Sequence, residues 1–164
     1  VGDTEFFNAI QSFKGASKRL EVLANTDKCI VFKDFAHAPS KALASLGAVR
    51  VQYPRRKVIA CVELHTYSSL SKEFMRQYAG TLDQADVAIV YYNPHALQLK
   101  RLPEITPQQI REGFGNSKLE VFNQSAELNA RLLREPSENS VFLMMSSGNY
   151  DGIDLNEFAT QVSS

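Results

Sequence analysis

An almost unbroken apolar run at residues 57–63, KVIACVE, constrains the fold of this chain more than any other feature. A strand with one face in water alternates apolar and polar residues. This run is apolar at both odd and even positions, which is typical of a central parallel strand covered on both faces. Two similar runs follow, DVAIVYY at residues 86–92 and SVFLMM at residues 140–145. We therefore expect a doubly wound α/β structure, a mostly parallel sheet with helices on both faces.

Segments with helical spacing of their apolar residues separate these strands, and strand–helix alternation of this kind predicts right-handed crossovers. Pro39 and the Thr106–Pro107 pair favour helix starts, because the first turn does not need the N–H that proline lacks. Asn93 is expected to begin a long loop. The predicted helices are residues 39–51, 71–82, 106–114, 125–133 and 155–162, and a shorter strand is predicted at 118–122.

The beginning of the chain has a different pattern. Residues 19–25 and 28–34 flank the turn-forming Asn25-Thr26-Asp27 and predict an antiparallel hairpin. Residues 1–14 are expected to contain a short helix, with several aromatic residues on one face, that links this chain to a preceding domain. The chain begins at Val1 rather than at a methionine, so we expect a fragment of a longer protein.

The composition suits one globular domain of 164 residues. Its formal net charge is zero, so no global charge favours nucleic acid or an anionic membrane as a partner. No apolar stretch is long enough to span a bilayer, and residues 1–15 lack the pattern of a signal peptide. Cys29 and Cys61 lie in predicted buried strands and indicate reduced core thiols, as expected of a cytoplasmic protein.

Three predicted loops follow the carboxyl ends of buried strands, at residues 34–39, 63–70 and 146–152. In a doubly wound sheet these ends face the same edge, where ligands usually bind. The polar side chains that this topology could bring together are Asp34, His37, Glu63, His65, Tyr67 and Ser146.

Several chemistries fit parts of this set poorly. A metal site built on His37 and His65 with two carboxylates has no ligand-spacing signature, so two loop histidines are the better interpretation. A Cys61 nucleophile is disfavoured because a buried thiol resists ionisation. Residues 146–148 match neither a nucleophile elbow nor a phosphate-binding loop, although a hydrolase using a serine near one histidine stays an alternative.

The order and spacing of five short segments resemble the C-terminal domain of Mur ligases, the ATP-dependent amide ligases of bacterial cell-wall synthesis. The family pattern Phe-x-Gly-x-x-Arg-Arg-Leu-Glu is followed by Asp-Tyr/Phe-Ala/Gly-His-His-Pro and by Gln-Pro-His-Arg-Tyr-Ser-Arg. The resemblance extends over residues 10–160. The matching segments are FKGASKRLE at 13–21, DFAHAP at 34–39, ELHTYSS at 63–69, DVAIV at 86–90 and MMSSGN at 144–149.

Within the family, the pattern is most similar to the branch that joins UDP-N-acetylmuramate to the tripeptide L-alanyl-γ-D-glutamyl-meso-diaminopimelate, with the L-alanine-adding branch as runner-up. The chain departs from the pattern at Lys18, at Ala38 in place of the second histidine, and at Thr66 and Ser69 in place of two arginines. These departures leave the acceptor open.

The resemblance implies a Rossmann-like three-layer sandwich of about six mostly parallel strands with an N-terminal antiparallel hairpin. It divides the chain into a linker helix at residues 1–14 and the nucleotide-capping, acceptor-binding domain at residues 15–164. It also implies that Arg19 reaches the γ-phosphate of ATP, a contact that a guanidinium suits.

The resemblance further implies that Asp34 accepts hydrogen bonds from the ribose, with Phe35 and His37 beside the nucleotide, and that His65 and Tyr67 line the acceptor side. ATP and Mg²⁺ would be bound mainly by a missing central domain, and UDP-N-acetylmuramate would be bound through the missing domains. Neither nucleic acid nor a membrane is an expected partner. The alternative is a free-standing Rossmann-like binding or regulatory domain.

Overall fold

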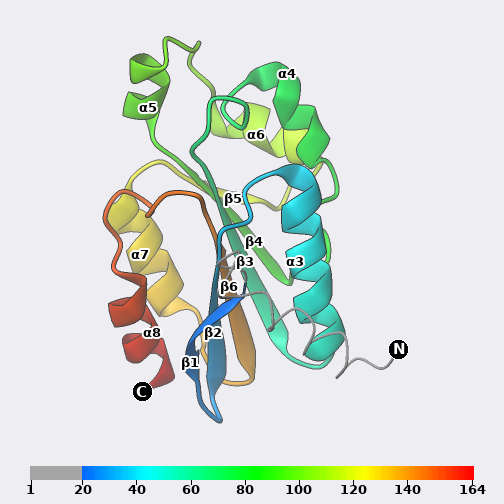
Figure 1. Ribbon diagram of the computed structural model, residues 1–164, viewed down its shortest axis with the longest axis vertical. Coiled ribbons are helices and arrows are strands. Elements are labelled where there is room, and N and C mark those ends of the chain that lie inside the picture. Colours follow the sequence, from blue (N-terminus) through cyan, green and yellow to red (C-terminus); the bar gives the residue numbers. More distant parts are fainter. Residues whose placement is uncertain (1–19) are drawn as a thin grey trace.

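The computed structural model describes residues 20–164. They form a six-stranded sheet in the order β1-β2-β6-β3-β4-β5, with helices on both faces (Figure 1). The strands are β1 (Glu21–Asn25), β2 (Cys29–Asp34), β3 (Lys57–Leu64), β4 (Val87–Tyr92), β5 (Glu120–Phe122) and β6 (Ser140–Met145). The helices are α3 (Pro39–Gln52), α4 (Lys72–Met75), the 3₁₀ helix η1 (Arg76–Tyr78), α5 (Pro94–Leu99), α6 (Pro107–Phe114), α7 (Ser125–Arg134) and α8 (Leu155–Ser163).

The sheet is parallel except for the β1–β2 hairpin, as predicted. β6 lies between β2 and β3 and pairs with both, so that Asp34, Met145 and Val62 stand in register across three neighbouring strands. The carboxyl ends of β2, β6 and β3 therefore meet at one edge. The Rossmann-like three-layer sandwich predicted from the sequence is confirmed.

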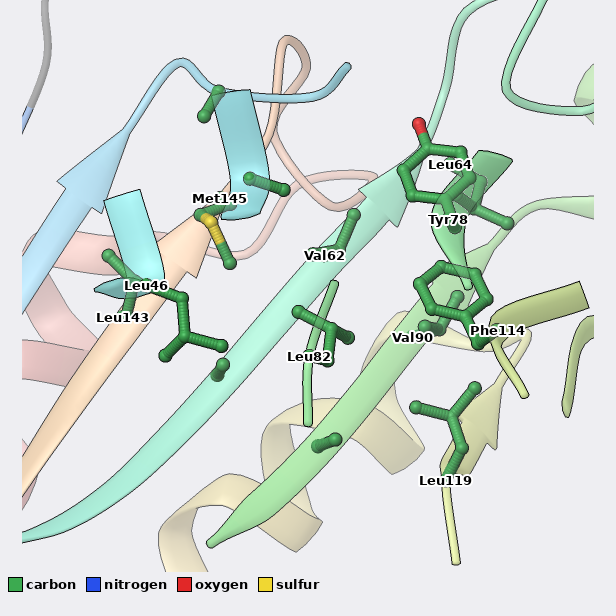
Figure 2. Close-up of a cluster of buried hydrophobic side chains, with 14 of the residues drawn as sticks. Leu46, Val62, Leu64, Tyr78, Leu82, Val90, Phe114, Leu119, Leu143 and Met145 are labelled. Carbon is green, nitrogen blue, oxygen red and sulfur yellow. The ribbon is translucent and has the colours of Figure 1, made fainter. Parts of the chain in front are cut away.

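Alternate residues of the central strands enter two separate cores. On the face covered by α3, η1 and α6, Figure 2 shows Leu46, Val62 and Leu143 packed together. Tyr78 stacks on Phe114 in the same cluster, with ring centroids 4.8 Å apart. On the opposite face, α7 and α8 cover a second core (Figure 1). Burial on both faces explains why polar residues do not recur at every second position of these strands.

Local signals set most helix ends. α6 begins with a capping box, in which the Thr106 hydroxyl accepts from Gln109 N and the Gln109 side chain accepts from Thr106 N. It ends at Gly115, whose φ of 64° is the left-handed conformation that glycine adopts readily. The loop predicted from Asn93 was wrong in part, because Asn93 caps α5 by accepting from His95 N, with Pro94 in the first turn.

The helix predicted at residues 71–82 is wrong. Only α4 and η1 form, because the chain turns at Gly80, where φ is 79° and the backbone N–H donates to Phe114 O. Tyr78 and Leu82 are nevertheless buried. Their spacing therefore indicated correctly that both side chains are buried, but it did not indicate a continuous helix. The linker helix predicted within residues 1–14, and Arg19, lie outside the described residues.

Candidate functional site

Asp34 ends β2 at the carboxyl edge of the sheet and is fully buried. Its Oδ1 accepts from Ala36 N at 3.1 Å, whereas Oδ2 is buried and has no hydrogen-bond partner among residues 20–164. A buried carboxylate oxygen without a donor carries a desolvation penalty that a ligand hydroxyl could offset. The Asp34 backbone oxygen accepts from Ser146 N at 2.9 Å, which joins the loops after β2 and β6.

The loop between β2 and α3 presents an aromatic pair. Phe35 is 46% exposed, and its ring meets that of His37 edge to face with 5.6 Å between centroids. Nδ1 of His37 lies 3.1 Å from Phe35 O, and the Tyr78 hydroxyl donates to His37 O. Tyr78 therefore anchors the backbone of the loop and leaves its aromatic side chains at the surface.

Glu63 lies near the end of β3 and is the centre of a polar network. It is 2% exposed, and its Oε1 accepts from the Ser146 hydroxyl and from Tyr150 N, the latter at 2.9 Å. The Ser146 oxygen in turn accepts from Gly148 N at 2.7 Å. A Cβ at position 148 would lie 3.0 Å from Glu63 Oε1, so the backbone approaches this carboxylate as closely as glycine allows.

The loop after β6 bends back under this network. Tyr150, Asp151 and Gly152 have φ values of 53°, 57° and 100°, three successive residues in the left-handed region. The Tyr150 hydroxyl lies 2.9 Å from Cys61 O and 2.7 Å from Met145 O, and the Tyr91 hydroxyl donates to Asp151. Burial raises the pKa of both phenols.

His65 and Tyr67 lie on the loop that leaves β3. The His65 side chain is 48% exposed, with Nδ1 3.9 Å from Glu63 Oε2, and Tyr67 is 62% exposed. Thr66 and Ser69, which stand where the family pattern has arginines, form hydrogen bonds with one another. Their hydroxyl oxygens are 3.1 Å apart, and Ser69 N donates to Thr66 Oγ1. This loop therefore offers an imidazole and a phenol but no guanidinium.

The carboxyl edge brings together Glu63, His65 and Ser146, as the topology predicted. Asp34 is linked to them through backbone but lies on the other face of the sheet, because Phe32, two residues earlier, enters the core under α3. Phe35 and His37 lie on the β2–α3 loop, and Tyr67 is at the surface. The roles predicted for these residues, and for Arg19, stay predictions.

Tyr150 and the bonded role of Ser146 were missed by sequence reasoning, which interpreted residues 146–148 as a plain loop. The available signal was Glu63 itself, a carboxylate at the end of an otherwise apolar strand, which needs donors when it is buried. Those donors come from a segment more than 80 residues away, so no local pattern reveals them.

Other chemistries find little support in residues 20–164. In that range, no group of three or more His, Cys, Asp or Glu side chains is placed to hold a metal ion. Burial raises the pKa of the Cys61 thiol, which disfavours a nucleophile there. Ser146 bonds to a carboxylate rather than to a histidine. None of the helices in this part of the chain is long and apolar enough to cross a membrane.

A family model described as "Mur ligase, glutamate ligase domain" matches residues 18–148. A UDP-N-acetylmuramate–L-alanine ligase of Paenarthrobacter aurescens is 29% identical over 140 residues, which are 85% of this chain and 30% of that protein. The protein of the same name from Sulfurihydrogenibium sp. is 32% identical over 118 residues, which are 70% of this chain and 25% of the relative. The chain thus spans less than a third of either relative.

The fold also has solved counterparts. The crystal structure of a domain from a putative UDP-N-acetylmuramate:L-alanyl-γ-D-glutamyl-meso-diaminopimelate ligase of Haemophilus ducreyi matches with a TM-score of 0.63 at 22% identity. The match covers 88% of this chain and 99% of that domain, and at this identity it shows the fold alone. Because the family model extends over most of the chain, the chain belongs to the Mur ligase family through its glutamate ligase domain.

Proposed function

We propose that this chain is the C-terminal, nucleotide-capping and acceptor-binding domain of a cytoplasmic ATP-dependent amide ligase. The ligase joins the carboxylate of UDP-N-acetylmuramate to the amine of an amino acid or peptide in peptidoglycan synthesis or recycling. Residues 15–164 form the domain and residues 1–14 link it to the rest. The family match supports this proposal, as do two relatives named UDP-N-acetylmuramate–L-alanine ligases.

The observation that carries the nucleotide role is Oδ2 of Asp34, which is buried and receives no hydrogen bond from the described part of the chain. It lies at the carboxyl edge of a parallel sheet, where β2 pairs with β6, and this edge is where such sheets bind ligands. A ribose hydroxyl is a neutral donor that would satisfy it. Asp34 is buried in the chain alone, so the residues that cover it must move before a ribose can reach Oδ2.

The remaining parts of the reaction are divided between domains. ATP phosphorylates the substrate carboxylate, and the acceptor amine then displaces phosphate from the acyl phosphate. Residues 20–164 contain no carboxylate cluster suited to Mg²⁺, so we assign the metal and most phosphate contacts to the rest of the ligase. Arg19 reaches the γ-phosphate, where a fixed positive charge stabilises the transferring group.

The test is Asp34→Asn in the intact ligase. We expect the KM for ATP to rise about tenfold to a hundredfold, the equivalent of roughly 1.5–3 kcal/mol for a hydrogen bond to a charged group. Asp27→Asn is the matched control, because Asp27 is an exposed residue of the β1–β2 turn. Unchanged KM for ATP in Asp34→Asn, with ligation intact, would remove Asp34 from the nucleotide site. Arg19→Ala is expected to lower kcat sharply.

A further inference from the structure

Glu63 and His65 form a carboxylate–imidazole pair at the carboxyl end of β3. Glu63 is the penultimate residue of β3, and His65 is the first residue after the strand ends. Glu63 is almost completely buried, His65 is half exposed, and Nδ1 of the ring faces Oε2 of the carboxylate at 3.9 Å. This is an electrostatic contact rather than a hydrogen bond.

The two carboxylate oxygens of Glu63 have different surroundings. Oε1 accepts from Ser146 and Tyr150, both neutral donors, whereas no hydrogen bond from residues 20–164 reaches Oε2. No lysine or arginine occurs in the adjoining segments 63–71 and 145–164, so no cation of these two loops neutralises the carboxylate. Oε2 is therefore left to His65, the one ionisable base of residues 20–164 that lies within ion-pair distance.

The backbone of residue 148 closes the other side of the pair. A Cβ there would meet Glu63 Oε1 at 3.0 Å and His65 Cγ at 3.2 Å, so Gly148 packs against both side chains at once. The loop thus restricts how the pair can move, although the imidazole edge stays open to solvent. A side chain that acts as an acid or base must be held in place and must also be reachable by the group with which it exchanges a proton. The imidazole of His65 meets both conditions.

A carboxylate facing Nδ1 favours the tautomer in which Nδ1 carries the proton, since two lone pairs would otherwise oppose each other. That tautomer leaves the lone pair on Nε2. An acceptor amine reaches a ligase as an ammonium ion at neutral pH and has no lone pair with which to attack an acyl phosphate. It must first lose a proton to a nearby base.

We propose that Glu63 is a positioning residue, which holds His65 as the Nδ1–H tautomer so that Nε2 accepts this proton. The N–H bond of the ammonium breaks, an N–H bond forms at Nε2, and the electron pair stays on the amine nitrogen. That pair then forms the amide C–N bond as the C–O bond to phosphate breaks, and the second proton that the nitrogen must lose to become an amide leaves with the released phosphate. The inference rests on the proposed function, but its first consequence can be measured without activity.

The first test is the histidine tautomer, read from side-chain ¹⁵N NMR of this 164-residue chain. His37 and His95 serve as internal references. In Glu63→Gln the introduced carbonyl can keep the two donors on Oε1, while the amide N–H₂ faces Nδ1 and imposes the Nε2–H tautomer. We expect His65 alone to switch from Nδ1–H to Nε2–H. An Nε2–H pattern in the unsubstituted chain, or no switch, would overturn the assignment.

The second test uses the intact ligase. We expect Glu63→Gln to lower kcat about a hundredfold, within the range for acid–base catalysis, with the KM for ATP unchanged. The exposed Glu157→Gln on α8 is the control. Hydroxylamine, whose nitrogen is unprotonated at neutral pH, should react with the acyl phosphate equally fast in Glu63→Gln and in the original enzyme, because no proton need be removed first.

The outcomes separate the two proposals. A ligase that lacks ATP-dependent ligation before any substitution would refute the proposed function whatever the tautomer is. Normal ligation with an unchanged kcat in Glu63→Gln would refute only the role of Glu63. A loss of kcat that extends equally to hydroxylamine would show a structural effect and would also overturn the inference.

Discussion

The hydroxyl of Ser146 donates to the carboxylate of Glu63 and so joins the loop after β6 to the end of β3, 83 residues away in the sequence. Both atoms are buried at the carboxyl edge of the sheet, where β6 meets β3. The same oxygen accepts from Gly148 N, so a single side chain fixes both the strand end and the turn after it. Replacing it should therefore affect stability more than an ordinary loop serine would.

Ser146→Ala is expected to lower the free energy of unfolding by about 1.5–3 kcal/mol, because a buried carboxylate loses one of its two donors. The neighbouring Ser147→Ala is a matched control: Ser147 Oγ is buried and finds no hydrogen-bond partner within residues 20–164, so its removal should cost nothing or stabilise slightly. Urea unfolding monitored by circular dichroism measures both. Equal losses in the two variants would contradict the network as described.

Two helical glycines should respond to alanine in opposite directions. A Cβ at Gly113 would lie 2.7 Å from Met75 Cγ and 3.2 Å from Met75 O, so Gly113→Ala should destabilise by about 1–3 kcal/mol through overpacking between α4 and α6. At Gly47 the nearest atom is 4.0 Å away, so Gly47→Ala should stabilise α3 by roughly 0.5–1 kcal/mol. Thermal or urea unfolding of each variant and of the original chain measures whether the free energy of unfolding falls or rises.

Glu135 should make stability depend on pH in the acid range. Burial alone would raise the pKa of this carboxyl, but hydrogen bonds and charges from Lys57 and Arg131 outweigh burial and hold the pKa below its ordinary 4.5. A carboxyl with a lowered folded-state pKa stabilises above its unfolded pKa, and that contribution disappears as pH falls through the folded value.

The check is Glu135→Gln, followed by urea unfolding across pH. The difference in unfolding free energy between the original chain and the variant should be constant from neutral pH down to about the ordinary 4.5, and should shrink below it. Glu138→Gln, at an exposed position on the adjoining turn, is the control substitution. A difference that grows on acidification would mean that the ion pairs do not stabilise the fold.

Both cysteines should be unreactive while the chain is folded. Cys29 and Cys61 are fully buried, and burial raises the pKa of each thiol. Alkylation by iodoacetamide, followed by mass spectrometry, should label neither in native buffer and both in denaturant, with the same urea midpoint as unfolding. Rapid native labelling of one site would show local opening of β2 or β3.

The central strands were predictable because each is buried on both faces. Apolar runs placed β3, β4 and β6 within one residue of their observed bounds. Helix starts with proline and a cap, such as α6, were equally clear from short-range chemistry. The failed helix at residues 71–82 shows the limit: Tyr78 and Leu82 must be buried, but turns can bury them as well as a helix can.

The sequence predicted at which edge of the sheet the candidate site lies, but not how its side chains contact one another. Topology predicted that six polar residues could converge there, because parallel strands end on the same side, and the structure brings together Glu63, His65 and Ser146. Topology could not show that Ser146 bonds to Glu63, or that one Asp34 oxygen finds no partner within residues 20–164, since these depend on side-chain placement between strands distant in sequence. The central place of β6 is likewise set by long-range pairing.

The position of β6 between β2 and β3 has a consequence for how the chain folds during synthesis. β2 and β3 do not pair with one another; each bonds to β6. On the ribosome, the hairpin β1–β2 and the strands β3 to β5 therefore emerge as two separate pieces with bare edges, and the seam between them closes only when residues 140–145 have left the exit tunnel. We expect nascent chains stalled before this point to need protection by chaperones.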